Sequence, residues 1–114
     1  MKNNIFLPAV PSAELVGRMI ENAFGVEEIV SIPRATWGFY DWCQENGMDM
    51  IEWVRKLDEV RSPQIGFNDY LWLCLWSLHC SRLKQDLPCP PNSEPEGYSD
   101  FLEAVERGDI IEMM

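Results

Sequence analysis

The sequence contains few of the residues that enzymes and metal sites use. Its 114 residues include one histidine, His79, and four cysteines, no two of which form a C-x-x-C pair. Cys80 follows His79 directly, but adjacent residues on a helix point about 100° apart and do not face each other. The seven glycines stand singly, so there is no glycine-rich loop that could hold a phosphate. We therefore expect no catalytic residues, no metal ion, no cofactor and no enzymatic activity.

Basic residues are scarce as well. Nine Lys and Arg residues stand against 19 Asp and Glu residues, which gives a formal net charge of −10. This charge repels nucleic acids and anionic membranes at long range. It is unevenly distributed, because residues 86–114 contain one basic and eight acidic residues, whereas residues 28–85 contain six and eight. The acidic segment is either a solvated surface or a surface that binds a basic partner.

Long hydrophobic runs are missing too. The longest apolar stretch, residues 70–78, is far shorter than the roughly 20 residues that a membrane span requires, and the N-terminus lacks the hydrophobic region of a signal peptide. We expect a cytoplasmic protein without membrane contact. In that compartment the cysteines are expected to be reduced and mostly buried. They are Cys43, Cys74, Cys80 and Cys89.

What the sequence does have is a large hydrophobic and aromatic content. Hydrophobic residues make up 46% of the chain and five of them are tryptophans, a composition that requires a packed core. The hydrophobic periodicity predicts a mainly α fold with four to five helices and one short strand. The expected helices cover residues 12–24, 36–46, 49–61, 70–85 and 99–107, and the expected strand covers residues 26–32.

The first expected helix and the strand rest on local patterns. Hydrophobic residues within 15–24 recur with the period of a helix, Ser12 can cap its start and Gly25 can end it. Residues 26–32 are short, β-branched and followed by a proline, which favours a strand. A single strand must pair either elsewhere in the chain or with a second copy.

The later helices carry clearer signals. Gly47 separates two of them, and Asp49 with Glu52 forms a capping box at the start of the second. Asn68 can cap the next helix, whose first part, residues 70–76, is apolar on all sides. Such a helix belongs at the centre of the core or in a subunit interface.

The chain reads as one domain in three parts. Residues 1–85 form the expected helical core. Residues 86–97 contain four prolines and are expected to be an extended connector. Residues 98–114 form an acidic C-terminal helix and tail.

Residues 28–83 resemble a ribbon-helix-helix domain. The resemblance rests on the strand EIVSI, the bend at Pro33 and Arg34, the helices WGFYDWCQENG and MDMIEWVRKLDEV, and the segment GFNDYLWLCL, which is similar to a third helix in one bacterial subgroup. It implies an obligate two-fold dimer whose strands pair between copies into a ribbon that enters the DNA major groove. The DNA contacts it implies are Ser31, Arg34, Arg55, Lys56 and Arg61.

The sequence departs from that family at the positions that read DNA. The outward strand positions are Glu27, Ile29 and Ser31, whereas base readout favours Arg, Lys, Asn or Gln. Asp49 would oppose a phosphate at the start of the second helix. DNA binding by a dimeric transcriptional regulator is therefore the alternative hypothesis and not the first.

The leading hypothesis is a small acidic, non-enzymatic regulatory or inhibitory protein that binds another protein with a basic surface. Proteins of this kind occur among phage-encoded inhibitors, including anti-CRISPR proteins, which is an analogy of class only. A third interpretation is an oligomerisation domain that forms a homodimer or larger assembly through its aromatic helix. The expected protein-binding residues are Glu94, Glu96, Asp100, Glu103, Glu106, Asp109 and Glu112.

Overall fold

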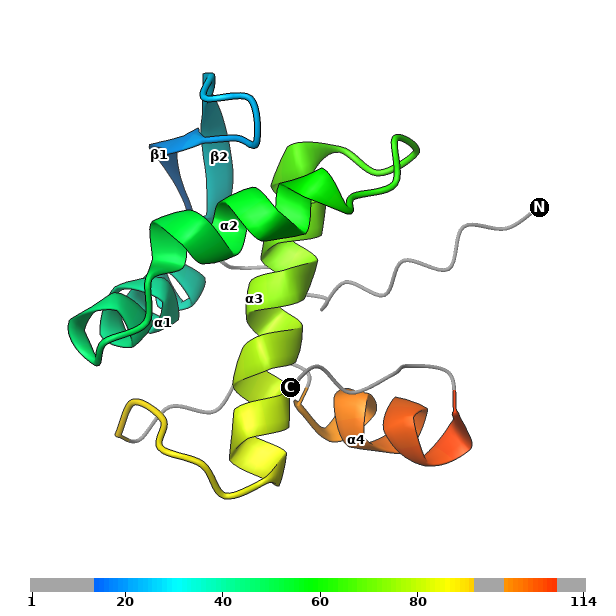
Figure 1. Cartoon of the computed structure of the whole chain (residues 1–114). Coiled ribbons are helices and arrows are strands. Elements are labelled where there is room, and N and C mark those ends of the chain that lie inside the picture. Colours follow the sequence, from blue (N-terminus) through cyan, green and yellow to red (C-terminus); the bar gives the residue numbers. More distant parts are fainter. Residues whose placement is uncertain (1–13, 92–97, 109–114) are drawn as a thin grey trace.

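The part of the chain that the structure describes is a β-hairpin followed by four helices. The computed structural model describes residues 14–91 and 98–108. The elements are β1 (Leu15–Glu21), β2 (Glu27–Pro33), α1 (Arg34–Glu45), α2 (Met50–Glu59), α3 (Phe67–Lys84) and α4 (Tyr98–Arg107). α3 runs through the middle of the molecule, with the hairpin and α2 at its N-terminal end, α1 beside it, and α4 against its C-terminal half (Figure 1).

The expectation of a mainly α fold with one strand is wrong, because a second strand lies within the first expected helix. Residues 15–21, inside the expected helix 12–24, form β1, which pairs antiparallel with β2. The register sets Val16 opposite Ile32. β2 thus has its partner within the chain and does not need a second copy, as the ribbon of a ribbon-helix-helix dimer would. The protein is a small fold of mixed α and β structure.

Asn22 and Gly25 build the turn between the strands. The backbone N of Gly25 donates to the carbonyl of Asn22 at 3.1 Å, and the Gly25 φ of 77° lies in the left-handed region that favours glycine. The Oδ1 atom of Asn22 accepts hydrogen bonds from the backbone N of Phe24 at 2.9 Å and of Val26 at 3.1 Å. A turn followed by a left-handed residue is a common hairpin loop. Gly25 therefore belongs to a hairpin turn and does not end a helix.

The helices after the hairpin follow the sequence more closely. Gly47, with a φ of 95°, separates α1 from α2, and the Asp49 side chain accepts a hydrogen bond from the backbone N of Glu52 at 3.1 Å. Both features were predicted and are confirmed. α3 begins at Phe67, one residue before the predicted cap Asn68, whose side chain binds β2 and not its own helix.

α3 is a core helix. Ten of its 18 residues are buried. Its N-terminal part packs with β2, α1 and α2 in a cluster that includes Trp37 and Phe39, whereas Trp76 and Cys80 form a second cluster against α4. The apolar helix is therefore covered by its own chain, which leaves it little surface for a subunit interface. None of the helices in the described parts of the chain is long and apolar enough to cross a membrane.

Candidate functional site

The hairpin has one buried face and one exposed face. On the inner face, Val30 and Ile32 are fully buried, and Val16 and Ile20 pack against the core. The alternate side chains point away from the core and form what we call the outer hairpin face. It consists of Leu15, Gly17, Met19, Glu21, Glu27, Ile29 and Ser31.

Apolar side chains dominate the outer hairpin face and the turn beside it. The exposed fractions of Leu15, Met19 and Ile29 are 54%, 53% and 69%. The turn adds Phe24 at 86% and Val26 at 57%, and we call these two residues the hairpin tip. Only three other large hydrophobic side chains are exposed in the described parts of the chain, and none of them is on the hairpin. Clustered exposed apolar side chains are typical of interaction surfaces.

The apolar residues of the outer hairpin face are continuous across the two strands. Met19 and Ile29 are directly opposed in the register, a pairing that brings side chains into contact. A methyl group added at Gly17 would lie 3.4 Å from both Ile29 Cγ2 and Ser31 Oγ, so these two side chains border the space above the glycine. The glycine therefore places no side chain at the centre of the face, and its backbone is accessible.

Arg18 fixes the inner face of the hairpin to α1. Its guanidinium donates two hydrogen bonds to the Asp41 carboxylate, both at 2.8 Å, and lies 4.8 Å from the centre of the Trp37 ring. The Trp37 Nε1 atom donates to the carbonyl of Val16 at 2.7 Å. The hydrogen bonds from Arg18 hold the pKa of Asp41 below its usual value. These contacts explain why a charged residue lies on the inner face of β1.

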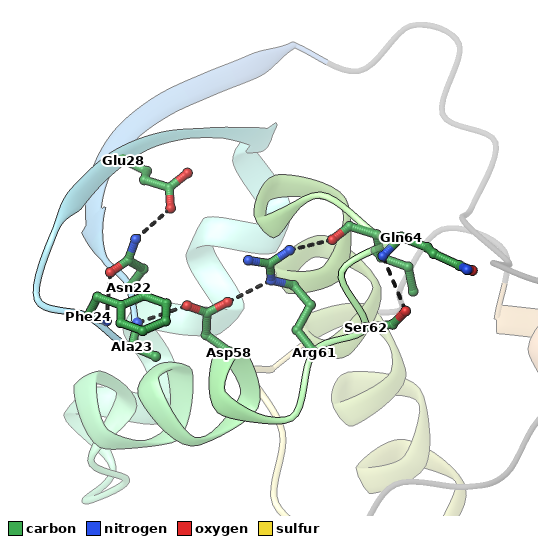
Figure 2. A network of polar contacts seen from close by, with 9 residues as sticks. Asn22, Ala23, Phe24, Glu28, Asp58, Arg61, Ser62 and Gln64 are labelled. Atoms are coloured by element: carbon green, nitrogen blue, oxygen red, sulfur yellow. Dashed lines mark hydrogen bonds and ion pairs between the residues drawn. The ribbon is translucent and has the colours of Figure 1, made fainter.

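Asp58, at the end of α2, fixes the other end of the hairpin (Figure 2). Its carboxylate accepts hydrogen bonds from the backbone N of Ala23 at 2.8 Å and from Arg61 Nε at 2.6 Å. Arg61 also donates through Nη1 to the carbonyl of Ile65 at 2.5 Å. The hairpin turn, the end of α2 and the following loop are thus joined through one carboxylate, which positions the hairpin tip.

The function of this surface must be inferred from its own chemistry. No family model, curated protein or solved structure matches this chain. Within the described residues, no three side chains of the metal-binding types form a group that could hold a metal ion. Burial raises the pKa of the Cys43 and Cys74 thiols to about 11, so both are protonated and unreactive at neutral pH.

Asn68 occupies the second edge of β2. Its Oδ1 atom accepts a hydrogen bond from the backbone N of Ser31 at 2.6 Å, and its Nδ2 atom donates to the carbonyl of Ser31 at 3.2 Å. The side-chain amide thus takes the place of a peptide group in a third strand. This contact also holds the start of α3 against the sheet.

An Asn68→Asp substitution is expected to lower the free energy of unfolding by about 1–2 kcal/mol, because a carboxylate oxygen replaces the Nδ2 donor and faces the carbonyl of Ser31. Urea denaturation measures the loss. Gln64→Glu makes the same chemical change at an exposed position and is expected to stay within about 0.5 kcal/mol of the wild type. Equal stability of the two variants would show that the Asn68 contact contributes nothing.

The acidic residues predicted to bind a partner fall into two groups. Asp100, Glu103 and Glu106 are exposed on α4, whereas Leu102 and Val105 of the same helix pack against α3. Glu103 is within 3.9 Å of Arg107, a weak ion pair at the surface. The others lie outside the described residues. They are Glu94, Glu96, Asp109 and Glu112.

The basic residues of the DNA-binding alternative are not brought together. Arg34 pairs with Glu14 at 2.9 Å at one end of the hairpin, whereas Arg61 pairs with Asp58 at the other end. The seven-residue strand between these ends places them roughly 20 Å apart. Both guanidinium groups are also already bound to carboxylates of this chain.

The remaining DNA-binding candidates lie elsewhere. Arg55 forms an ion pair with Glu52 on its own helix, and Lys56 is exposed beside it on α2. Ser31 is on the outer hairpin face, but Asn68 holds both of its backbone polar groups. The geometry therefore favours the apolar outer hairpin face, which the sequence did not single out, over either predicted set of charged residues.

Proposed function

We propose that the protein is a small non-enzymatic regulatory or inhibitory protein that binds another protein through its outer hairpin face. The observation that carries this proposal is the exposure of Leu15, Met19 and Ile29 on one face of the hairpin, where Met19 and Ile29 are directly opposed and the hairpin tip lies beside them. Arg18 holds the hairpin that carries this face to α1, and Asp58 holds its turn to α2. A surface that is already ordered loses little conformational entropy when it binds.

The partner is expected to present basic residues around an apolar centre. Glu21 and Glu27 are exposed and directly opposed at the turn end of the outer hairpin face. The exposed acids of α4 and the net charge of −10 add long-range attraction for a basic protein. Because none of the described cysteines forms a disulfide and three of them are buried, we place the protein in the reducing cytoplasm.

The test compares the same substitution at two positions that are exposed to a similar extent. Ile29→Glu puts a charge in the outer hairpin face, and Ile51→Glu puts the same charge at a position on α2 that is exposed to a similar extent, 62% against 69%. Since both side chains are exposed, both variants are expected to unfold within a few °C of the wild type. In affinity purification from the cells that make the protein, Ile29→Glu is expected to lose its partner at least about tenfold more strongly than Ile51→Glu.

Two results would contradict the proposal. One is a partner that binds wild type and Ile29→Glu equally well, which would move the interface to another surface. The other is the absence of any partner retained at stoichiometric level by the wild type at both low and physiological salt, which would remove protein binding altogether.

A further inference from the structure

Within residues 14–91 and 98–108, one edge of the β1 backbone has no hydrogen-bonding partner. The ladder to β2 continues as hydrogen bonds from Arg34 N to Glu14 O at 3.2 Å and from Asn22 N to Val26 O at 2.9 Å, which assigns the ladder bonds to the even-numbered residues of β1. The N–H and C=O groups of the odd-numbered residues therefore point away from β2. Nothing in the described parts of the chain is hydrogen-bonded to them.

The opposite edge of the hairpin is less available. Asn68 already holds both backbone groups of Ser31, and Pro33 has no N–H to donate. A strand added there would meet two consecutive outward positions without free donors. The hairpin can therefore extend along β1, where Gly17, Met19 and Glu21 each offer an N–H and a C=O.

We propose that the partner protein binds by adding an extended strand along the free edge of β1. This inference rests on the proposed function and names the mode of binding. The added strand continues the sheet, and its alternate side chains extend the apolar surface of Leu15, Met19 and Ile29. The segment that fits has apolar residues at every second position.

The charges on the outer hairpin face define one more feature of that segment. Glu21 and Glu27 face each other directly across the strands, an arrangement of like charges that is unfavourable by itself. None of the ion pairs found in the described residues includes either glutamate. A Lys or Arg in the added strand, at the end near the hairpin turn, would relieve this repulsion.

A second copy of the chain is the poorer occupant. Pairing β1 with β1 of another copy would bring together two chains that each carry a net charge of −10. It would also place two more carboxylates on the extended face and no cation to match them. The partner is therefore a different, basic protein.

Gly17→Pro and Gly17→Ala separate strand addition from side-chain docking. Proline at this position removes an N–H that points away from β2, so the hairpin keeps its own ladder while its free edge is blocked. Alanine keeps the N–H and makes only ordinary contacts with Ile29 and Ser31, each at 3.4 Å. The midpoint of thermal unfolding establishes that both variants are folded before binding is compared.

The probe is a displayed library of random peptides about ten residues long, which is enough to span a strand. Selection on the wild-type protein is expected to enrich peptides with alternating apolar residues and at least one Lys or Arg. The selected peptides are expected to bind Gly17→Pro at least about tenfold more weakly than Gly17→Ala, which adds a methyl group but keeps the N–H. Two versions of a selected peptide carry methyl groups on alternate backbone nitrogens, one on the odd-numbered residues and the other on the even-numbered residues. Only the version whose methylated nitrogens face β1 is expected to lose binding.

Each other outcome overturns the proposal. Equal binding to Gly17→Pro and the wild type, together with loss of binding in Ile29→Glu, would show that the outer hairpin face binds without strand addition, so the proposed function would stand alone. A wild-type dimer in light scattering that Gly17→Pro dissociates would identify a second copy as the occupant. A selection that yields no binders also counts against strand addition, because main-chain pairing makes few demands on sequence.

Discussion

Replacing Asp58 with alanine is expected to lower the free energy of unfolding by about 3 kcal/mol, measured by urea denaturation near neutral pH. The Asp58 carboxylate is 1% exposed and accepts hydrogen bonds from Ala23 N and Arg61 Nε. Its removal leaves the partly buried N–H of Ala23 and a guanidinium that is 23% exposed without their acceptor. The cost of an unpaired buried group exceeds the net contribution of the intact pair, which is why the effect is large.

The neighbouring acid supplies the control. Glu59→Ala removes a carboxylate from an exposed position on the same helix and is expected to change the stability by no more than about 0.5 kcal/mol. Asp58→Asn should fall between the two, because its amide oxygen can still accept from Ala23. A loss below about 1 kcal/mol in Asp58→Ala would show that water replaces the carboxylate and that the hairpin tip is held by other contacts.

The periodicity predicts a helix over β1 because both faces of the strand carry apolar residues, Val16 and Ile20 on the inner face and Leu15 and Met19 on the outer one. Leu15 and Met19 point outward, whereas Arg18 points toward the core, so the alternation that identifies a strand is blurred. Arg18 is stable there because Asp41 binds its guanidinium and Trp37 lies under it. These partners come from α1, more than 15 residues away, and no local pattern shows them.

Two local signals did point to a hairpin. Gly17 lies in the middle of the segment, where a helix would lose stability, and the turn between two apolar segments contains Asn22 and Gly25 at a spacing that hairpin loops favour. The prediction that Gly25 ends a helix was wrong, since Gly25, with a φ of 77°, lies in the hairpin turn. The same conformation ends helices and closes hairpins, so the glycine could not decide between them.

The later part of the fold was predictable because its signals are local. The Asp49 cap and the turn at Gly47 depend on residues within a few positions of each other. Asn68 shows the limit of such reasoning, since an asparagine near a helix start is typical of a cap but here binds Ser31, 37 positions earlier in the chain. Only the packing of α3 against the sheet decides which bond forms.

The candidate surface escaped prediction for a related reason. Hydrophobic patterns are interpreted on the assumption that apolar residues are buried, so an exposed apolar face has no signal of its own. Ile29 was assigned to the outward face of its strand by alternation, and it is 69% exposed. Met19 could not be placed beside it until β1 was known to be a strand. Leu15 and Met19, the outward apolar residues that obscure the strand pattern of β1, are thus part of the candidate surface.

Lowering the pH from about 7 to about 4 is expected to cost the protein about 3 kcal/mol of stability through His79 alone. The imidazole is buried and stacks on Phe39 with ring centres 4.2 Å apart and planes within 5°. Burial lowers the pKa of His79 from 6.5 to about 4. Between these two values the unfolded chain binds a proton that the folded chain does not, so stability is full above pH 6.5 and falls as the pH decreases toward 4.

The measurement is the free energy of unfolding as a function of pH in the wild type and in His79→Gln, which keeps a polar side chain at this position but does not titrate. The substitution alters the stack on Phe39, so the absolute stabilities of the two proteins are not compared. The quantity compared is the change in the free energy of unfolding between about pH 7 and pH 4. Carboxylates such as Asp41 titrate alike in both proteins and cancel in the comparison. The wild type is expected to lose about 3 kcal/mol more than His79→Gln over this interval. Parallel pH profiles would contradict the buried, neutral imidazole, because a histidine with the same pKa in the folded and unfolded chain contributes no slope.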